Sequence, residues 1–340
     1  MSRLASPIRR VTLHDVARHC DVSYQTVSRV VNNDPHVAKE TRRRVLRAIK
    51  ELNYQPNRVA RSLVTQRSNL IEVITFGGQH YGPAQMVTHV EQAARQRGYN
   101  LILTNITRMT LEEIQAAIHS LSGRLIDGFI LVTPVVGVGY EELAEICGNI
   151  PFVMIDAPQQ STAPSVVINQ RYGSQLATQH LIDLGHREIC EISGPMNWHG
   201  AVARHESWQQ TLEAAAITPG LSVEGNWTPI GGYEATCRLL ASGAHFTGLV
   251  VGNDQMALGA MRALREHHLR IPEDISVVGF DDIPEAICFE PPLTTVHQDF
   301  AALGRQAVEY LLDLMNRVDT PLQQRVLYPS LVERQSTRHV

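Results

Sequence analysis

The sequence predicts an α/β protein in which a small, all-helical head precedes a core of two lobes built on parallel sheets. Three observations lead to this prediction. Residues 11–63 have the spacing of short, capped helices, and from residue 70 onward short apolar runs alternate with helical stretches. Positive charge is concentrated in the amino-terminal fifth of the chain. The chain is therefore divided into a head (1–56), a connecting segment (57–68) and a core (69–340).

Two short helices separated by a tight break are expected at residues 13–19 and 24–31. Thr12 can cap the first helix, with Asp15 three residues later as a capping box requires, and Ser23 can cap the second. A third, highly charged helix is expected at 39–52. The apolar residues that would form the small core of the head are Val16, Val27, Val30, Val45, Ile49 and Leu52. This is the pattern of a helix-turn-helix.

The charge distribution supports the same interpretation. Residues 1–70 contain 14 Lys and Arg against 5 Asp and Glu, a net charge of +9, whereas residues 71–340 contain 16 against 29, a net charge of −13. A basic run alone would equally suit a solvated surface. Its coincidence with a capped helix-turn-helix pattern favours a head that binds a polyanion such as nucleic acid.

The segment after the third helix leaves two interpretations open. Pro56 disfavours a helical conformation at the preceding residue, and Asn57 can cap a short stretch at 58–63. Such a stretch is too short to be a stable helix alone in water. It is either a flexible linker or a hinge helix that forms only when DNA and a second subunit support it.

In the core, two series of strands and helices are expected. The first series has strands at 71–76, 100–104, 128–132, 151–155 and 166–168, with helices at 86–97, 111–121 and 140–147. The second has strands at 189–193, 249–251 and 275–280, with helices at 202–215, 233–241 and 255–267. A last helix at 300–316 is followed by segments 325–328 and 331–333, which are expected to cross back and complete the lobes. The amino-terminal lobe is predicted as residues 69–168 plus 298–324, and the carboxyl-terminal lobe as 169–297 plus 325–340.

Parallel sheets bind ligands beyond the carboxyl ends of their strands, so an enzyme is a fair rival interpretation. The sequence lacks a dinucleotide-binding glycine motif, a phosphate loop, a nucleophile elbow and a zinc-protease motif, so we expect no enzyme, no cofactor and no metal. The five cysteines contain no Cys-x-x-Cys pair and are expected to be reduced. With no apolar run of about 18 residues and no signal peptide, we expect a cytoplasmic protein without membrane contact.

Several longer stretches carry a resemblance that covers residues 11 to about 337. They are residues 22–32, 51–54 with 56–60, 253–263, 274–279 and 291–295. In these stretches the chain resembles the lac repressor family of bacterial transcription regulators. The resemblance implies a DNA-reading head and a core of periplasmic-sugar-binding architecture, with an effector held between the two lobes.

The resemblance also implies roles for individual residues of the head. Tyr24, Gln25 and Arg29 match the positions that read base edges in the major groove, and Gln and Arg can pair in two places with adenine and guanine. Positions that hold phosphates or adjust register are matched by Thr12, Ser23, Thr26, Ser28, Asn32, His36, Thr41 and Tyr54. In the hinge, Leu63 matches an apolar wedge for the minor groove, and Asn57 and Ala60 lie beside it.

In the core, the implied effector site combines polar groups with apolar walls. Positions that hold sugar hydroxyls are matched by Asp156, Arg204, Asn253 and Asp281, and further positions by Gln298 and Arg108. Trp227 and Phe300 match apolar walls. Alone, either aspartate would equally suit a loop carboxylate or a helix cap, but four polar groups just past strand ends or at helix starts favour a site.

The chain departs from the family pattern around this site. Ile168 replaces a pocket aromatic residue. Larger or more polar residues stand near the expected mouth, and Phe76 is counted among the effector contacts: Phe76, His80, Tyr81, Trp198 and His199. These departures imply a different or larger sugar, such as a disaccharide or another glycoside.

The expected function is that of a sequence-specific repressor. It would bind double-stranded, pseudo-palindromic operator DNA of the lac type and be released by a sugar inducer, a galactoside or another disaccharide or glycoside. The sequence ends without the heptad repeats of a tetramerisation helix, so we expect a homodimer. Two alternatives remain open: a regulator of the same fold that needs its ligand to bind DNA, and a sugar-binding or sugar-modifying protein without DNA function.

Overall fold

The computed structural model describes residues 11–31, 34–54, 67–120, 126–135, 137, 139–158, 162–317 and 320–340. The chain forms two compact units, Met1–Ser68 and Asn69–Val340. Four residues to which DNA contacts were assigned lie outside the described residues, and so does the stretch 58–63: Asn32, Asn57, Ala60 and Leu63.

Three helices make up the head: α1 (Leu13–His19), α2 (Tyr24–Val31) and α3 (Lys39–Glu51). The two predicted caps are confirmed. The Asp15 amide donates to Thr12 Oγ1 at 3.3 Å while the Asp15 carboxylate accepts from the Thr12 amide at 2.9 Å, which is a complete capping box. Ser23 Oγ accepts from the Thr26 amide at 3.1 Å at the start of α2. These local bonds fix where α1 and α2 begin.

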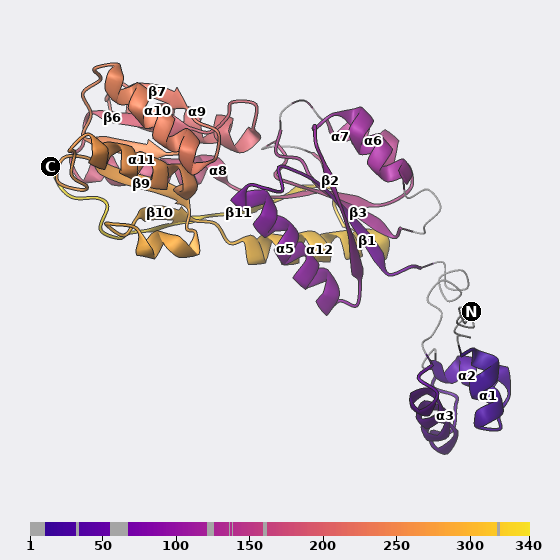
Figure 1. The fold of residues 1–340 in the computed structure, drawn as a ribbon. Helices are drawn as coiled ribbons and strands as arrows, with labels where there is room; N and C mark the ends of the chain where they lie inside the picture. Colours follow the sequence, from indigo (N-terminus) through magenta and orange to yellow (C-terminus); the bar gives the residue numbers. More distant parts are fainter. Residues whose placement is uncertain are drawn as a thin grey trace, which may run out of the picture. The chain divides into compact units, whose positions relative to one another are not determined.

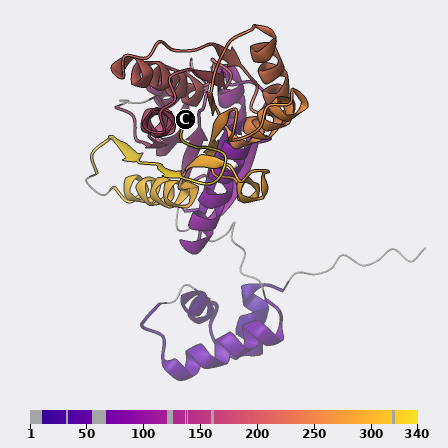
Figure 2. The same ribbon diagram turned by 90° about the vertical axis from the view of Figure 1, so that its left-hand side faces the viewer.

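The head has its own small core, in which the three helices pack on one another (Figure 2). Four of the six predicted core residues are buried, while Ile49 and Leu52 are only partly buried at its edge. Tyr54 belongs to this core as well, and only 7% of its surface is exposed. The assignment of Tyr54 to the DNA-contacting surface therefore does not describe its ring, which packs inward.

The first lobe of the core is a six-stranded sheet in the order β11-β5-β4-β3-β1-β2, with every neighbouring pair parallel. Its strands are β1 (Leu70–Phe76), β2 (Asn100–Ile106), β3 (Gly128–Val132), β4 (Phe152–Ile155), β5 (Ser165–Ile168) and β11 (Gln324–Leu327). Helices α5 (Tyr81–Gln96) and α12 (Phe300–Met315) cover one face, side by side in Figure 1. Helices α6 (Leu111–Ser120) and α7 (Tyr140–Cys147) cover the other.

The second lobe is also a six-stranded sheet, in the order β12-β10-β9-β8-β6-β7, and only the β10–β12 pair is antiparallel. Its strands are β6 (Ile189–Ser193), β7 (Ser222–Glu224), β8 (Gly248–Val251), β9 (Ser276–Asp281), β10 (Thr294–His297) and β12 (Ser330–Val332). Helices α8 (Gln170–Asp183) and α9 (His199–Ala214) cover one face, and α10 (Pro229–Ala241) and α11 (Asp254–Glu266) the other. A 3-10 turn, η1 (Pro284–Cys288), follows β9. The predicted fold class is confirmed.

The chain passes between the lobes three times: from β5 to α8, from β10 to α12 and from β11 to β12. The third passage differs from the predicted lobe boundary at residue 324. Because β11 (Gln324–Leu327) pairs in parallel with β5, residues up to Leu327 belong to the first sheet. Four elements of the second lobe were not predicted: α8, β7, β10 and the 3-10 turn η1.

Helices α10 and α11 approach each other through glycine. A Cβ atom at Gly259 of α11 would lie 1.8 Å from the Pro229 carbonyl oxygen, and one at Gly232 of α10 would lie 2.1 Å from the Met256 carbonyl oxygen. Both obstacles are backbone atoms, which cannot move aside as a side-chain tip could. The close contact of α10 and α11 therefore requires residues without a side chain at positions 232 and 259.

We expect Gly259→Ala to destabilise the core by about 2 kcal/mol or more, because the added methyl group forces two helices apart. Thermal unfolding followed by calorimetry measures the change. Gly82→Ala in α5 is the matched control, since a Cβ there meets nothing within 4 Å and alanine favours a helix. Equal unfolding midpoints for the two variants would contradict the packing argument.

Candidate functional site

A pocket lies where the carboxyl ends of strands from both lobes face one another. Asp156 follows β4, Asn253 follows β8, Asp281 ends β9 and Gln298 follows β10. The space that they enclose, with its opening to solvent, is about 450 Å³, within the usual range for small-molecule sites. The other lining residues are His80, Tyr81, Gly82, Pro83, Met86, Gln170, Trp198, Gly200, Arg204 and Trp227.

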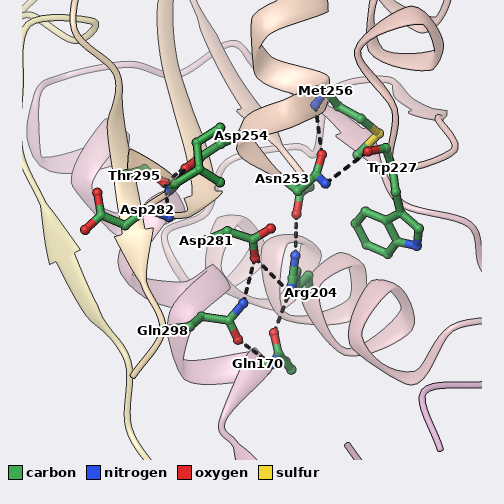
Figure 3. Close-up of polar contacts among 12 residues, drawn as sticks. Gln170, Arg204, Trp227, Asn253, Asp254, Met256, Asp281, Asp282, Thr295 and Gln298 are labelled. Atoms are coloured by element: carbon green, nitrogen blue, oxygen red, sulfur yellow. Dashed lines mark hydrogen bonds and ion pairs between the residues drawn. The ribbon is translucent and has the colours of Figure 1, made fainter. Parts of the chain in front are cut away.

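Arg204 of α9 is the centre of the polar network in this pocket (Figure 3). Its Nε donates to Gln170 Oε1 at 2.9 Å, its Nη1 donates to the Gly252 carbonyl, and its Nη2 lies 4.0 Å from Asp281 Oδ1. Gln170 Nε2 in turn donates to Gln298 Oε1 at 2.9 Å, and Gln298 Nε2 donates to Asp281 Oδ1 at 2.7 Å. The four side chains thus form a closed ring of polar contacts, which fixes the guanidinium.

The Arg204 guanidinium also packs against two aromatic rings, those of Phe280 and Trp227. The Arg204 guanidinium carbon lies 3.7 Å from the centroid of the Phe280 ring and 5.5 Å from that of Trp227. Trp227 meets Trp198 at 5.8 Å between centroids, with the ring planes at 72°. Trp198 in turn packs against Phe76 and His80. The pocket therefore combines a positioned cation with an aromatic wall.

Asp156 differs from the other polar groups of the pocket because no described residue donates a hydrogen bond to its carboxylate. Its side chain is partly exposed to the cavity. Burial raises the pKa of Asp156 to about 6, against the attraction of Arg204. Burial likewise raises the pKa of Asp281 to about 6, while Arg204 and the Gln298 hydrogen bond lower it. The pocket therefore holds two carboxylates that lack part of their solvation and can accept hydrogen bonds from a ligand.

Asp254, at the first position of α11, has a structural role behind the pocket. Thr295 Oγ1 donates to its Oδ1 at 2.5 Å, and the Ile283 amide donates to its Oδ2 at 2.9 Å. Burial and the neighbouring Asp281 raise the pKa of Asp254 to about 8. Gly279 leaves room for this carboxyl group, because a Cβ there would lie 2.2 Å from Asp254 Oδ1. The position of β9 relative to α11 is fixed by these contacts.

The backbone is strained at the pocket. Asp156, Trp227 and Asp281 have φ angles of 59°, 67° and 113°, a region that side-chain-bearing residues rarely adopt. Such conformations persist only where the surrounding structure enforces them, and they cluster at functional sites. Here they turn two carboxylates and an indole towards one cavity.

The structure brings together six of the nine residues predicted for the effector site: Asp156, Arg204, Trp227, Asn253, Asp281 and Gln298. Phe76 and Phe300 stand behind the lining, against Trp198 and Tyr81 respectively. Arg108 is not in the pocket. Its Nε donates to Glu113 Oε1 at 2.8 Å, and 78% of its side chain is exposed.

The Asn253 side chain has little hydrogen-bonding capacity left for a ligand, although it lines the pocket. Its Oδ1 accepts from the Met256 amide at 2.8 Å as the cap of α11, and its Nδ2 donates to the Trp227 carbonyl at 3.2 Å. Gln170 is the polar residue that the sequence reasoning missed. It is the first residue of α8, two residues after the predicted strand at 166–168, so a signal near the strand end was present.

On the head, the predicted base-reading residues share one exposed face of α2. Tyr24, Gln25 and Arg29 are exposed, while Val27 and Val30 point into the core. Tyr24 stacks on His14, with 4.7 Å between ring centroids. Because both Gln25 and Arg29 are long, polar and exposed, this face can reach base edges in a groove.

Most of the residues predicted to contact phosphates are at least partly exposed. Thr12 and Ser23 are exposed at the starts of α1 and α2, where their hydroxyl groups also serve as caps. The His36 side chain is 87% exposed, and its Nδ1 lies 3.0 Å from Asp34 Oδ1. Three further positions are half-buried: Thr26, Ser28 and Thr41.

Two general features were also tested within the described parts of the chain. No helix there combines the length and the apolar character that crossing a bilayer requires. Nor do three or more His, Cys, Asp or Glu side chains gather there as metal ligands would.

Comparison with known proteins agrees with this architecture. Residues 12–57 match the bacterial regulatory proteins of the lacI family, and residues 178–337 match a periplasmic binding protein-like domain. The lactose operon repressor of Escherichia coli strain K12 is 38% identical over 97% of this chain and 91% of its own length. The transcriptional repressor PurR of Haemophilus influenzae strain PittEE is 37% identical over 97% of this chain and 99% of its own.

Solved structures show the same relationship. The crystal structure of the lac repressor dimer bound to operator and the anti-inducer ONPF superimposes with a TM-score of 0.90. It is 38% identical and covers 97% of this chain and 100% of its own. With a helix-turn-helix head, a two-lobed parallel-sheet core and relatives that match nearly end to end, the chain belongs to the lacI family of bacterial regulatory proteins.

Proposed function

We propose that this regulator is a repressor that binds a pseudo-palindromic, lac-type operator as a dimer and is released by a sugar. The observation that carries the proposal is the pocket between the lobes. It sets the Arg204 guanidinium and the Asp156 carboxylate, which receives no hydrogen bond from the part of the chain that the structure describes, beside an aromatic wall. Sugars are recognised by this combination, because hydroxyl groups both donate and accept while ring faces are apolar.

The proposal for DNA rests on the exposed face of α2. Gln25 can form two hydrogen bonds with adenine, and Arg29 two with guanine. The phosphate contacts around them carry no sequence information but fix the register of the helix in the groove. Operator sequence is therefore read mainly by Tyr24, Gln25 and Arg29.

The proposal of a dimer rests on exposed apolar side chains of the core and on the twofold character of operators. Leu103 on the edge strand β2 is 52% exposed, Ile230 of α10 is 71% exposed, and Leu258 of α11 is 46% exposed. Burial of such side chains in a subunit interface would be favourable. Sugar and operator would then be coupled reciprocally: each weakens the binding of the other by the same factor.

A second candidate is a regulator that needs its ligand to bind DNA. PurR is almost as similar to this chain as the lactose operon repressor is, at 37% against 38% identity, so the similarity does not separate the two candidates. Gel retardation with operator DNA and ligand-free protein separates the two candidates. Binding without ligand supports the induced repressor, and binding only with ligand supports the alternative.

We expect Gln25→Ala to weaken specific operator binding by about 1–3 kcal/mol, because it removes a two-bond contact to a base. Fluorescence anisotropy with operator and scrambled duplexes measures the change. Gln92→Ala, an exposed glutamine in α5, is the matched control. If the affinities for the two duplexes fall equally in Gln25→Ala, Gln25 does not read sequence.

We expect Arg204→Ala to retain operator binding and to lose release by sugar, because the ring of polar contacts loses its centre. Titration of the protein–operator complex with sugars measures release. Arg262→Ala removes an arginine from an exposed Arg–Glu pair in α11 and should respond like the parent protein. Undiminished release by sugar in Arg204→Ala would place the effector elsewhere.

Sugar affinity should fall as the pH falls through 6. The pKa of Asp156 is about 6, so its carboxyl group is mostly ionised at pH 7 and mostly protonated at pH 5. Only the ionised form accepts hydrogen bonds from sugar hydroxyl groups with both of its oxygens. Protons then compete with the sugar, and the dissociation constant should be about tenfold higher at pH 5 than at pH 7. Calorimetric titration between pH 5 and 8 measures this.

The control for this pH dependence is Asp156→Asn, which keeps the shape of the side chain and does not titrate. Asp281, with its own pKa of about 6, stays in the variant and leaves a residual slope. An unchanged pH profile in Asp156→Asn would show that Asp156 does not contact the sugar.

A further inference from the structure

The two lobes also touch each other on the side of the core away from the three chain passages. The passages begin or end at β11 and β5 in the first sheet and at β12 and β10 in the second, which are neighbouring strands at one edge of each sheet. The other contact is made by the loops after β1 and β3 in the first lobe and the loop after β6 in the second. These strands belong to the opposite half of their sheets, so the contact closes the cleft on its far side.

Part of this contact is a backbone pairing between the lobes. Val135, after β3, and Trp198, before α9, form a single antiparallel β-bridge. Beside it, the His199 amide donates to the Pro134 carbonyl oxygen at 2.7 Å. His199 is the first residue of α9, where an amide has no acceptor within its own helix. The acceptor that the helix cannot supply therefore comes from the other lobe.

The Trp198 side chain occupies a socket in the first lobe. Its ring centroid lies 5.7 Å from that of Phe76 and 5.4 Å from that of His80, and only 8% of the residue is exposed. Gly77 leaves room for the indole, because a Cβ there would lie 2.6 Å from Trp198 Cη2. Phe76 and Val135 pack against the apolar core of the second lobe, to which Trp198 belongs. The socket thus joins the two lobes through one large apolar side chain.

Closing this contact also has a cost. His199 Nε2 is buried, and the part of the chain that the structure describes holds no hydrogen-bond partner for it. Burial lowers the pKa of His199 and likewise that of His80. Parting of the lobes would return both imidazoles to water, which offsets some of the loss of apolar burial. Opposing contributions of this kind suit a contact that opens and closes.

We infer that this contact is a clasp that holds the two lobes together, and that Trp198 has to leave its socket before the lobes can part. The clasp consists of Phe76, Gly77, His80, Pro134 and Val135 in the first lobe and of Trp198 and His199 in the second. Trp198 is therefore a positioning residue for the lobes. The clasp goes beyond the proposed function, and only its effect on the entry of sugar rests on that function.

Hydrogen exchange of the full chain tests the clasp, read at single amides by mass spectrometry with fragmentation. The His199 amide should exchange at least a hundredfold more slowly than in an unstructured peptide. Its position at a helix start would otherwise leave it unprotected, so slow exchange reports on the bond to the other lobe.

Variants of the socket then open the clasp. Gly77→Ala places a methyl group against the Trp198 ring and should raise the exchange rate of the His199 amide at least tenfold. Gly98→Ala is the matched control, because Gly98 also has a left-handed φ angle, 78° against 70° for Gly77, but a Cβ there meets nothing within 4 Å. Trp198→Ala should act like Gly77→Ala, and it decides the question if Gly77→Ala fails to fold.

Two amides that are bonded within a single lobe report on folding in every variant. The Phe129 amide donates to the Pro151 carbonyl at 2.9 Å in the first lobe, and the Gly252 amide donates to the Ile192 carbonyl at 2.8 Å in the second. Both should exchange as slowly in the variants as in the parent protein. Faster exchange at all three amides would indicate general unfolding and would contradict a local clasp.

Stopped-flow fluorescence with lactose tests whether the clasp controls access to the pocket. The association and dissociation rates should both be at least threefold higher in Gly77→Ala than in Gly98→Ala, while the dissociation constant changes less than either rate. Gly77 is outside the lining of the pocket, so a change in direct sugar contacts would not produce this pattern.

Two results would overturn the clasp: exchange of the parent His199 amide at the rate of an unstructured peptide, or equal exchange of this amide in Gly77→Ala and Gly98→Ala. Equal lactose rates in the two variants would overturn its control of access. Failure of lactose to bind the parent protein would count against the proposed sugar response and leave the clasp to be decided by hydrogen exchange, which needs no ligand.

Discussion

The fixed position of one largely buried guanidinium, that of Arg204, is the constraint on which the pocket depends. Arg204 comes from α9, yet its contacts reach α8 through Gln170, the loop after β8 through Gly252, and the end of β9 through Asp281. A buried charge is tolerated only when it is paired and hydrogen-bonded. The second lobe must therefore assemble around Arg204, and in doing so it sets the floor of the cleft.

A second constraint is the cost of placing two carboxylates and a strained backbone in the lining of the pocket. Among the described residues none donates a hydrogen bond to the Asp156 carboxylate, three lining residues have left-handed φ angles, and burial disfavours the charged forms of Asp156 and Asp281. Carboxylate desolvation is a cost that hydrogen bonds from a ligand can offset, whereas the backbone conformations have to be enforced by the surrounding fold.

The sequence predicted best those features that local chemistry determines. The ends of α1 and α2 follow from the caps at Thr12 and Ser23, and the alternation of strands and helices follows from apolar runs. Helix α8 was missed because its buried face is built from small or polar residues such as Gly173, Ser174 and Thr178, which show no apolar period. Strand β10 was missed for a similar reason. Thr294 and Thr295 are fully buried, but their hydroxyl groups are paired with Thr337 and with Asp254 of α11, which lie far away in the sequence. Within the site, Arg108 was placed by resemblance alone, and a local ion pair with Glu113 accounts for its position instead.

The number of chain passages between the lobes limits how the core can move. A single linker would allow one lobe to rotate about the other in any direction, whereas three neighbouring segments oppose twisting and leave bending as the soft motion. The segments between β5 and α8, between β10 and α12, and between β11 and β12 also border the strand ends that carry Gln170 and Gln298. A molecule bound beside those two amides would therefore lie close to the axis of bending. A small change in the size of that molecule would change the angle between the two lobes.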